Sequence, residues 1–210
     1  MKIVMYGDSI TDFNRTRDRD GFPESYGFGY VFFVAGELLK EDPLKYEIIN
    51  RGVSGNRVVD LYGRLKGDVW NLKPDVVSIL VGVNDVWHEL DIANGVDIER
   101  FERLYGMMIE ETLQRLPNVK IIVCEPFIEK GSATESQYEQ LLEVKEYAKA
   151  AKRVAEKYGV YFLPLQEKLD EAAARFSVKD YVFDGVHPNA AGSRLIAEEW
   201  LKLFKEKICK

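Results

Sequence analysis

The chain alternates between short hydrophobic runs and longer segments in which hydrophobic residues recur every three or four positions. The short runs predict β-strands over residues 2–6, 46–50, 75–81, 119–124 and 160–163. The third run is almost continuously apolar, which is typical of a strand in a sheet that is covered on both faces. The longer segments predict amphipathic helices, the clearest over residues 101–116, 141–158 and 195–204.

This alternation of strands and helices predicts the fold class. Consecutive βα units with right-handed crossovers form a parallel sheet with helices on both faces, so we expect a doubly wound α/β protein. We find no internal repeat and no linker rich in Pro, Gly or Ser, and therefore expect a single domain over residues 1–210. Ligands bind such sheets beyond the carboxyl ends of the strands, which directs attention to the segments that follow each strand.

The composition is that of an ordinary globular protein, with 46% hydrophobic and 30% charged residues. Lys and Arg number 29 against 35 Asp and Glu, and the net charge of −6 argues against a nucleic-acid partner or an anionic membrane surface. The two cysteines, Cys124 and Cys209, are not in a CxxC spacing, which excludes a zinc ribbon or a thioredoxin-type site. Because we find no signal-peptide pattern and no long apolar stretch, we expect a cytoplasmic protein with no membrane partner.

Residues that could catalyse acyl transfer follow the predicted strands. Ser9 comes after the first strand, Gly55 after the second and Asn84 after the third, while Asp184 and His187 precede the last helix. A serine hydroxyl becomes a nucleophile when an imidazole takes its proton, and a carboxylate fixes the tautomer of that imidazole. Backbone N–H groups at the serine and at a glycine, together with an asparagine amide, would donate to the developing oxyanion. The pattern therefore favours a serine hydrolase.

Each of these residues also has an ordinary structural interpretation. Ser9 could be a helix N-cap, Gly55 a turn residue, Asn84 part of an Asx turn and Asp184 a cap for the turn near Pro188. An ordinary structural role is harder to find for His187, since the chain has only two histidines. The motifs GxSxG, GxxxxGK[ST], GxGxxG and HExxH are absent at the required places, so we expect no cofactor.

Four sequence blocks together resemble those of the GDSL/SGNH hydrolase family. They are residues 7–10, 50–56, 82–85 and 184–187, and the resemblance extends from residue 2 to about residue 204. It implies a flavodoxin-like, three-layer α/β/α fold with a five-stranded parallel sheet in the order 2-1-3-4-5, and a serine esterase without a cofactor. It assigns Ser9 as nucleophile and oxyanion donor, Gly55 and Asn84 as further donors, His187 as general base and Asp184 as its partner.

A narrower likeness points to a substrate. Residues 50–56, 83–87 and 187–192 are similar to those of bacterial intracellular acetylxylan esterases, which implies removal of acetyl groups from xylo-oligosaccharides and a homo-oligomer. Residues 12–28 are polar and carry several aromatic rings, a combination that suits sugar more than a long acyl chain. We therefore expect a small acylated substrate, with Asp8, Tyr26 and Trp87 as candidates for its pocket.

Alternatives remain open at this stage. The same Ser-His-Asp group could hydrolyse a lysophospholipid, a thioester or another lipid ester. A flavodoxin-like module could instead bind an anion or nucleotide without catalysis, although no phosphate-binding glycine pattern is present. The aromatic residues of segment 12–28 could pack on the first helix or on a partner subunit rather than contact a sugar.

Overall fold

Five parallel strands form one sheet at the centre of the computed structural model, which describes residues 1–209. The sheet order is β2-β1-β3-β4-β5, and every neighbouring pair is parallel. The strands are β1 Lys2–Gly7, β2 Glu47–Gly52, β3 Val76–Leu80, β4 Lys120–Cys124 and β5 Tyr161–Leu163. The predicted strands and their order are thereby confirmed, with bounds that differ by at most two residues.

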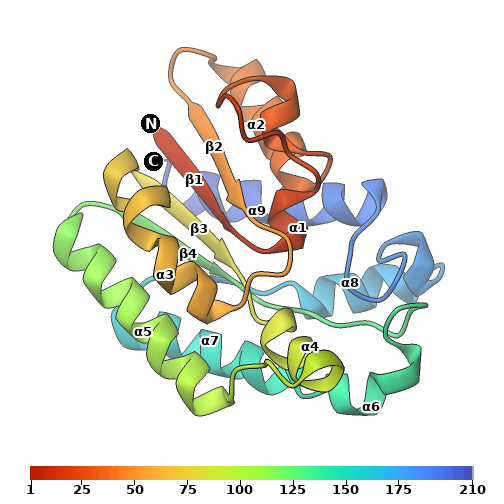
Figure 1. The fold of residues 1–210 in the computed structure, drawn as a ribbon. Helices are drawn as coiled ribbons and strands as arrows, with labels where there is room; N and C mark the ends of the chain where they lie inside the picture. The colour runs from red at the N-terminus through yellow and green to blue at the C-terminus, as the bar shows by residue number, and fades with distance from the viewer. Residues whose placement is uncertain (210) are drawn as a thin grey trace.

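Helices cover both faces of the sheet, as Figure 1 shows. On one face α2 (Tyr30–Glu41) packs against α9 (Ala190–Lys207), and on the other α5 (Ile98–Arg115) packs between α3 (Val58–Asp68) and α7 (Val144–Tyr158). The shorter helices are α1 Ser9–Asp12, α4 Val83–Ile92, α6 Tyr138–Leu141, α8 Gln166–Ala173 and the 3-10 turns η1 Pro23–Tyr26, η2 Trp70–Leu72, η3 Glu135–Gln137 and η4 Val178–Asp180. The three-layer α/β/α prediction is therefore confirmed.

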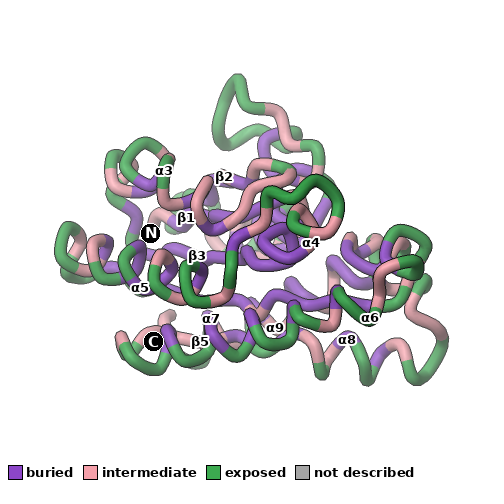
Figure 2. The backbone as a smooth tube through the Cα atoms, turned by 60° about the horizontal axis from the view of Figure 1, so that its bottom comes forward, coloured by how far each residue is buried: buried purple, intermediate pink, exposed green. Residues whose placement is uncertain are grey.

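The hydrophobic core lies between the sheet and these helices, where β1 and β3 are buried (Figure 2). Trp200 of α9 is fully buried, stacks on Phe204 with 5.0 Å between ring centroids and donates from Nε1 to Ser78 Oγ at 2.9 Å. Ser78 is the polar residue that interrupts the apolar run of β3. Its hydroxyl satisfies the indole N–H, which would otherwise be buried without a partner.

The carboxyl ends of β1 and β2 are paired through Gly7 and Gly52. A Cβ on Gly52 would overlap the backbone of Thr11 and Asp12, so the absence of a side chain allows α1 to pack directly on the end of β2. Asn50 reinforces this contact, since its Nδ2 donates to the carbonyl of Thr11 at 2.6 Å. The first helix is thus held against the second strand at the edge where ligands bind.

No helix among residues 1–209 is both long enough and apolar enough to cross a membrane.

We expect Gly52→Ala to lower the free energy of unfolding by about 1–3 kcal/mol, because the added methyl group forces the backbone of α1 away from β2. Gly63→Ala is the matched control: Gly63 lies on the exposed side of α3 with open space where a methyl group would be added, and alanine should stabilise that helix by about 0.5–1 kcal/mol. Urea unfolding of both variants measures the difference. Equal stability of the two variants would contradict the close packing of α1 on β2.

Candidate active site

Ser9 is the first residue of α1, directly after β1. The N-cap of α1 is Asp8, whose Oδ1 accepts a hydrogen bond from the N–H of Ile10 at 3.0 Å. The alternative that Ser9 is itself the N-cap is therefore wrong. Capping by its neighbour leaves the Ser9 hydroxyl available to contact another side chain.

Asp184 and His187 lie on the loop before α9, and the structure brings them to Ser9. Asp184 Oδ1 accepts from the N–H groups of Val186 at 2.9 Å and His187 at 2.7 Å, so the carboxylate also caps this turn. Its Oδ2 lies 2.7 Å from His187 Nδ1, and His187 Nε2 lies 2.9 Å from Ser9 Oγ. These three side chains form a continuous chain of hydrogen bonds, and the bond between His187 and Ser9 joins residues 178 positions apart.

The Asp184–His187 pair is electrostatically coupled. Burial alone would raise the pKa of Asp184, but hydrogen bonds from the His187 ring and from two backbone N–H groups lower it. Burial would likewise lower the pKa of His187, but the hydrogen bond to Asp184 and its negative charge raise it. With a proton on Nδ1 directed at Asp184, Nε2 is left to accept the hydroxyl proton of Ser9.

The segment 129–134 after β4, in which Glu129 and Thr134 are buried, supports the loop that carries Asp184 and His187. The N–H of Ala133 donates to the carbonyl of Asp184 at 2.9 Å, and the N–H of Glu129 donates to the carbonyl of Gly185 at 2.8 Å. Thr134 is fully buried, and its hydroxyl donates to the Glu129 carbonyl at 2.7 Å. A Cβ on Gly185 would overlap Thr134, and its φ of 100° also favours glycine. Sequence reasoning assigned no role to this segment.

Gly55 and Asn84 lie on two neighbouring segments. Gly55 has φ 79° in the loop after β2, so it is a turn residue as well as a candidate donor, and a Cβ there would lie 3.8 Å from His88 Cε1. Asn84 is buried in the first turn of α4, and its Nδ2 donates to the carbonyl of Asn56 at 3.0 Å. The side chain of Asn84 therefore ties the Gly55 loop to α4 rather than forming an Asx turn.

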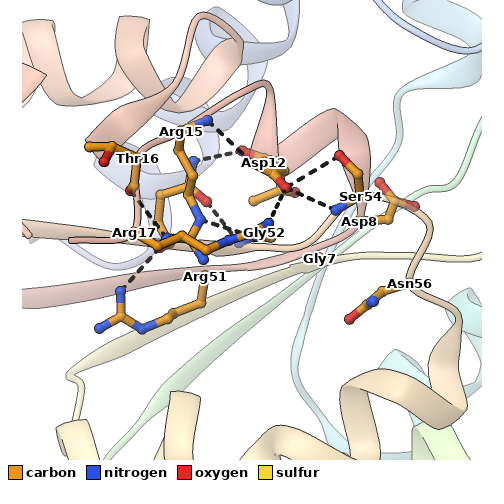
Figure 3. A network of polar contacts seen from close by, with 12 residues as sticks. Gly7, Asp8, Asp12, Arg15, Thr16, Arg17, Arg51, Gly52, Ser54 and Asn56 are labelled. Atoms are coloured by element: carbon orange, nitrogen blue, oxygen red, sulfur yellow. Dashed lines mark hydrogen bonds and ion pairs between the residues drawn. The ribbon is translucent and has the colours of Figure 1, made fainter. Parts of the chain in front are cut away.

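Asp12 joins the same loop to α1, as Figure 3 shows. Its carboxylate is only 3% exposed, and Oδ2 accepts from the N–H of Ser54 at 2.9 Å, from Ser54 Oγ at 3.2 Å and from Arg17 Nη2 at 2.8 Å. The sequence analysis placed Asp12 only at the start of the polar segment 12–28 and gave it no role of its own. Its position three residues after Ser9 could have indicated a role near the site. Its contact with Ser54, 42 positions away in the sequence, could not be predicted in this way.

A cavity of about 200 Å³ opens at Ser9. Its lining consists of Ser9, Phe13, Asn14, Ser54, Phe183 and His187. The Phe183 ring stacks on the His187 ring with 6.1 Å between centroids, and half of the phenylalanine side chain faces solvent.

The three residues predicted for the pocket are not among those that line this cavity. Asp8 is buried, and Tyr26 is buried with its carbonyl accepting a hydrogen bond from Asn50 Nδ2. Trp87 packs against the hydrophobic core. Phe183 was missed, although it directly precedes Asp184 in the sequence.

Within residues 1–209, no group of three or more His, Cys, Asp or Glu side chains is arranged to hold a metal ion.

Comparison with known proteins shows the class to which this fold and site belong. The family model of the GDSL-like lipases and acylhydrolases matches residues 5–195. An acetylxylan esterase from Geobacillus stearothermophilus is 33% identical over 208 residues, which cover 96% of this chain and 92% of the relative. The chain belongs to the GDSL-like lipase/acylhydrolase family, and it is a carboxylic ester hydrolase.

Solved structures agree with this assignment. A GDSL-like lipase candidate from Parabacteroides merdae superposes with a TM-score of 0.90 at 36% identity, covering 98% of this chain and 96% of that one. A mutant of Axe2, an acetyl-xylooligosaccharide esterase from Geobacillus, gives a TM-score of 0.84 at 32% identity, covering 96% and 92%. LAE5, a hydrolase from the metagenome of Lake Arreo, gives 0.84 at 31% identity, covering 96% and 93%. Catalytic mutants of Axe2 replace a serine, an aspartate and a histidine, the last two being three positions apart.

The burial of Asp8 makes the stability of the protein depend on pH. Its side chain is 1% exposed and Oδ2 has no hydrogen-bond partner within the described residues. Burial raises the pKa of Asp8 from about 3.8 to about 7, against the opposing effects of the Ile10 N–H and the His187 charge. Between these two values the folded protein binds a proton that the unfolded chain releases, so stability falls as pH rises through this window.

We expect Asp8→Asn to remove this fall, because an uncharged amide does not titrate. Relative to the wild type, the variant should become more stable from pH 4 to pH 7, by several kcal/mol at most, since one pKa unit corresponds to about 1.4 kcal/mol. Urea unfolding at intervals across the range measures the difference, with Asp18→Asn on the exposed loop as control. Parallel pH profiles for Asp8→Asn and the wild type would contradict the prediction.

Proposed function

We propose that this protein removes acetyl groups from carbohydrate, xylo-oligosaccharides in particular, with Ser9, His187 and Asp184 as its catalytic triad. The observation that carries the proposal is the pair of hydrogen bonds at His187, 2.9 Å from Nε2 to Ser9 Oγ and 2.7 Å from Nδ1 to Asp184 Oδ2. These distances lie within the range required for proton transfer between a nucleophile and its base.

In the first half of the reaction, Ser9 Oγ attacks the ester carbonyl carbon while His187 Nε2 takes the hydroxyl proton. The carbonyl oxygen becomes an oxyanion, and Asp184 stabilises the imidazolium that has formed. When this intermediate collapses, the bond to the sugar oxygen breaks and His187 returns the proton to that oxygen. A water molecule then attacks the acetyl-serine, again giving its proton to His187, and acetate leaves as the Ser9 hydroxyl is restored.

Three donors are available for the oxyanion. Within the described residues, neither the N–H of Ser9, at the start of α1, nor the N–H of Gly55 donates to another group of the chain. Asn84 Nδ2 carries two hydrogens, and its bond to the Asn56 carbonyl uses one of them. We assign these three groups as the oxyanion hole, because donors fixed before the reaction stabilise the developing charge without reorganisation.

The size and lining of the cavity support a short acyl group. Its volume of about 200 Å³ is below the roughly 300–1,000 Å³ typical of sites for larger ligands, and a long acyl chain would require an extended apolar groove. The exposed faces of Phe13 and Phe183 suit a sugar ring on the leaving-group side. The acetylxylan esterase relative supports the same substrate class. Homo-oligomeric assembly and a cytoplasmic location stay predictions from the sequence.

Ser9→Ala tests the nucleophile. We expect kcat for p-nitrophenyl acetate to fall by about 10⁴-fold or more, because the Ser9 hydroxyl is the one hydrogen-bonded to His187 Nε2 within the described residues. The thermal unfolding midpoint should stay close to that of the wild type, and Ser136→Ala, on the exposed surface, is the matched control. A fluorophosphonate should label the wild type and Ser136→Ala but not Ser9→Ala. Wild-type turnover by Ser9→Ala, or no labelling of the wild type, would overturn Ser9 as the proposed nucleophile.

Acyl-chain preference tests the substrate class. We expect kcat/KM for p-nitrophenyl esters to fall by about tenfold or more from acetate to octanoate, because the cavity at Ser9 is short. Phe183→Ala removes one wall and should raise octanoate hydrolysis relative to acetate. If the wild type preferred octanoate, the substrate would be a lipid ester, with the same triad.

A further inference from the structure

A second cavity is lined mainly by charged side chains, some of which come from segments that also line the Ser9 cavity. Its volume is about 430 Å³ and its lining residues are Arg15, Arg17, Arg51, Val53 and Asp68. Asn14 lines the Ser9 cavity, and the next residue, Arg15, lines the second one. Likewise Ser54 lines the Ser9 cavity, and the residue before it, Val53, lines the second one. The same two segments therefore contribute to both cavities, and Asp12 lies between the arginines and Ser54 (Figure 3).

Most charges around this cavity are already paired. Both terminal nitrogens of Arg51 lie 2.7 Å from the Asp20 carboxylate. Asp68 is the one acidic residue in the lining, and its Oδ2 accepts a hydrogen bond from Arg64 Nη1 at 2.6 Å. These pairs fix the walls of the cavity without neutralising all of its positive charge.

Arg15 is the exception. Its guanidinium donates only to backbone carbonyls, from Nε to Gly52 at 2.9 Å and from Nη1 to Thr16 at 3.5 Å, and within residues 1–209 it forms no ion pair. Arg17 uses Nη2 for Asp12, which leaves its other nitrogens without a partner in the described chain. Two guanidinium groups thus present unused donors to one cavity.

The surroundings of Arg15 favour an added negative charge. Burial lowers the pKa of the half-buried Arg15, and the positive charges of Arg17 and Arg51 act in the same direction. The negative charges of Asp12 and Asp68 oppose them. A cation held away from water beside like charges gains more from an anion than an exposed one does. The chain as a whole carries a net charge of −6, so this cluster is not part of a general basic surface.

We propose that this cavity binds the carboxylate of an acidic sugar unit on the acetylated substrate. The proposal rests on the proposed function, since it places the acidic unit beside the acetyl group at Ser9. The planar guanidinium of Arg15 can donate two parallel hydrogen bonds to a carboxylate, and Arg17 adds a further donor. A sugar phosphate presents similar oxyanion chemistry, and a binding measurement with both ligands separates the two.

The kinetic test compares two acetylated xylo-oligosaccharides of equal length, with and without a uronic acid side group. We expect the wild type to prefer the acidic substrate by about tenfold in kcat/KM, the value of one charge-assisted hydrogen-bond contact. Arg15→Gln and, separately, Arg17→Gln should lower this preference severalfold, mainly through KM, and added salt should reduce it. Use of a ratio cancels any general loss of activity. Arg19→Gln is the matched control, because Arg19 lies over the Phe22 ring on the same loop and does not line the cavity.

A binding measurement completes the test. Calorimetric titration of the Ser9→Ala protein with glucuronate, glucose 6-phosphate and glucose, at constant ionic strength, should show glucuronate binding that Arg17→Gln weakens. Binding of the phosphate alone would overturn the carboxylate assignment.

Failure of this proposal is distinguishable from failure of the proposed function. Equal kcat/KM for the acidic and neutral substrates, with acetate released from both, would overturn the acidic-sugar site and leave the esterase intact. If neither substrate released acetate, the proposed function would fail, and with it the placement of the acidic unit on an acetylated substrate.

Discussion

The close approach of α1 to the end of β2 is the constraint on which the rest of the site depends. Gly52 permits this approach because it has no side chain, and Asn50 secures it by donating to the Thr11 carbonyl. Once α1 is fixed there, Asp12 reaches Ser54 and orders the loop that contains Gly55. The segments after β1 and β2 thus form one unit, and the loop before α9 completes the site by bringing an imidazole to it. A parallel sheet makes this possible, since its strands all end at the same edge.

The pKa values of two aspartates near His187 are shifted in opposite directions by their surroundings. Asp184 accepts hydrogen bonds from the imidazole and from two backbone N–H groups, and its pKa is lowered. Asp8 has one oxygen without a partner within the described chain, and burial raises its pKa to about 7. The carboxylate suited to stabilising an imidazolium is therefore the one that remains ionised, whereas Asp8 has a structural role as the cap of α1. Such divergence between neighbouring acidic groups is how a protein gives chemically identical side chains different tasks.

Sequence patterns predicted the sheet because strand and helix periods are local properties of the chain. They also indicated Ser9, Asp184 and His187, since a serine after the first strand and an Asp/His pair three positions apart are readable without coordinates. The contacts of Asp12 and the support from Thr134 could not be read in this way, because their partners are distant in the sequence and are set by packing. The same limitation explains Tyr26 and Trp87, which are aromatic and close to the blocks that define the family, yet are turned into the protein interior or packed on the core. The N-cap of α1 is Asp8 rather than Ser9. Aspartate is itself a preferred N-cap residue, so the sequence next to Ser9 already offered this alternative.

The hydrogen bond between Ser9 and His187 joins positions separated by most of the chain. During synthesis the serine precedes the imidazole, and the two could not be aligned until β5 and the loop before α9 had also been synthesised and packed. With these two residues as the proposed nucleophile and base, hydrolysis would begin only after those segments have packed. If Ser9 and His187 act as proposed, ester cleavage would report the packing of these segments, and an activated serine would not exist on a partly folded polypeptide.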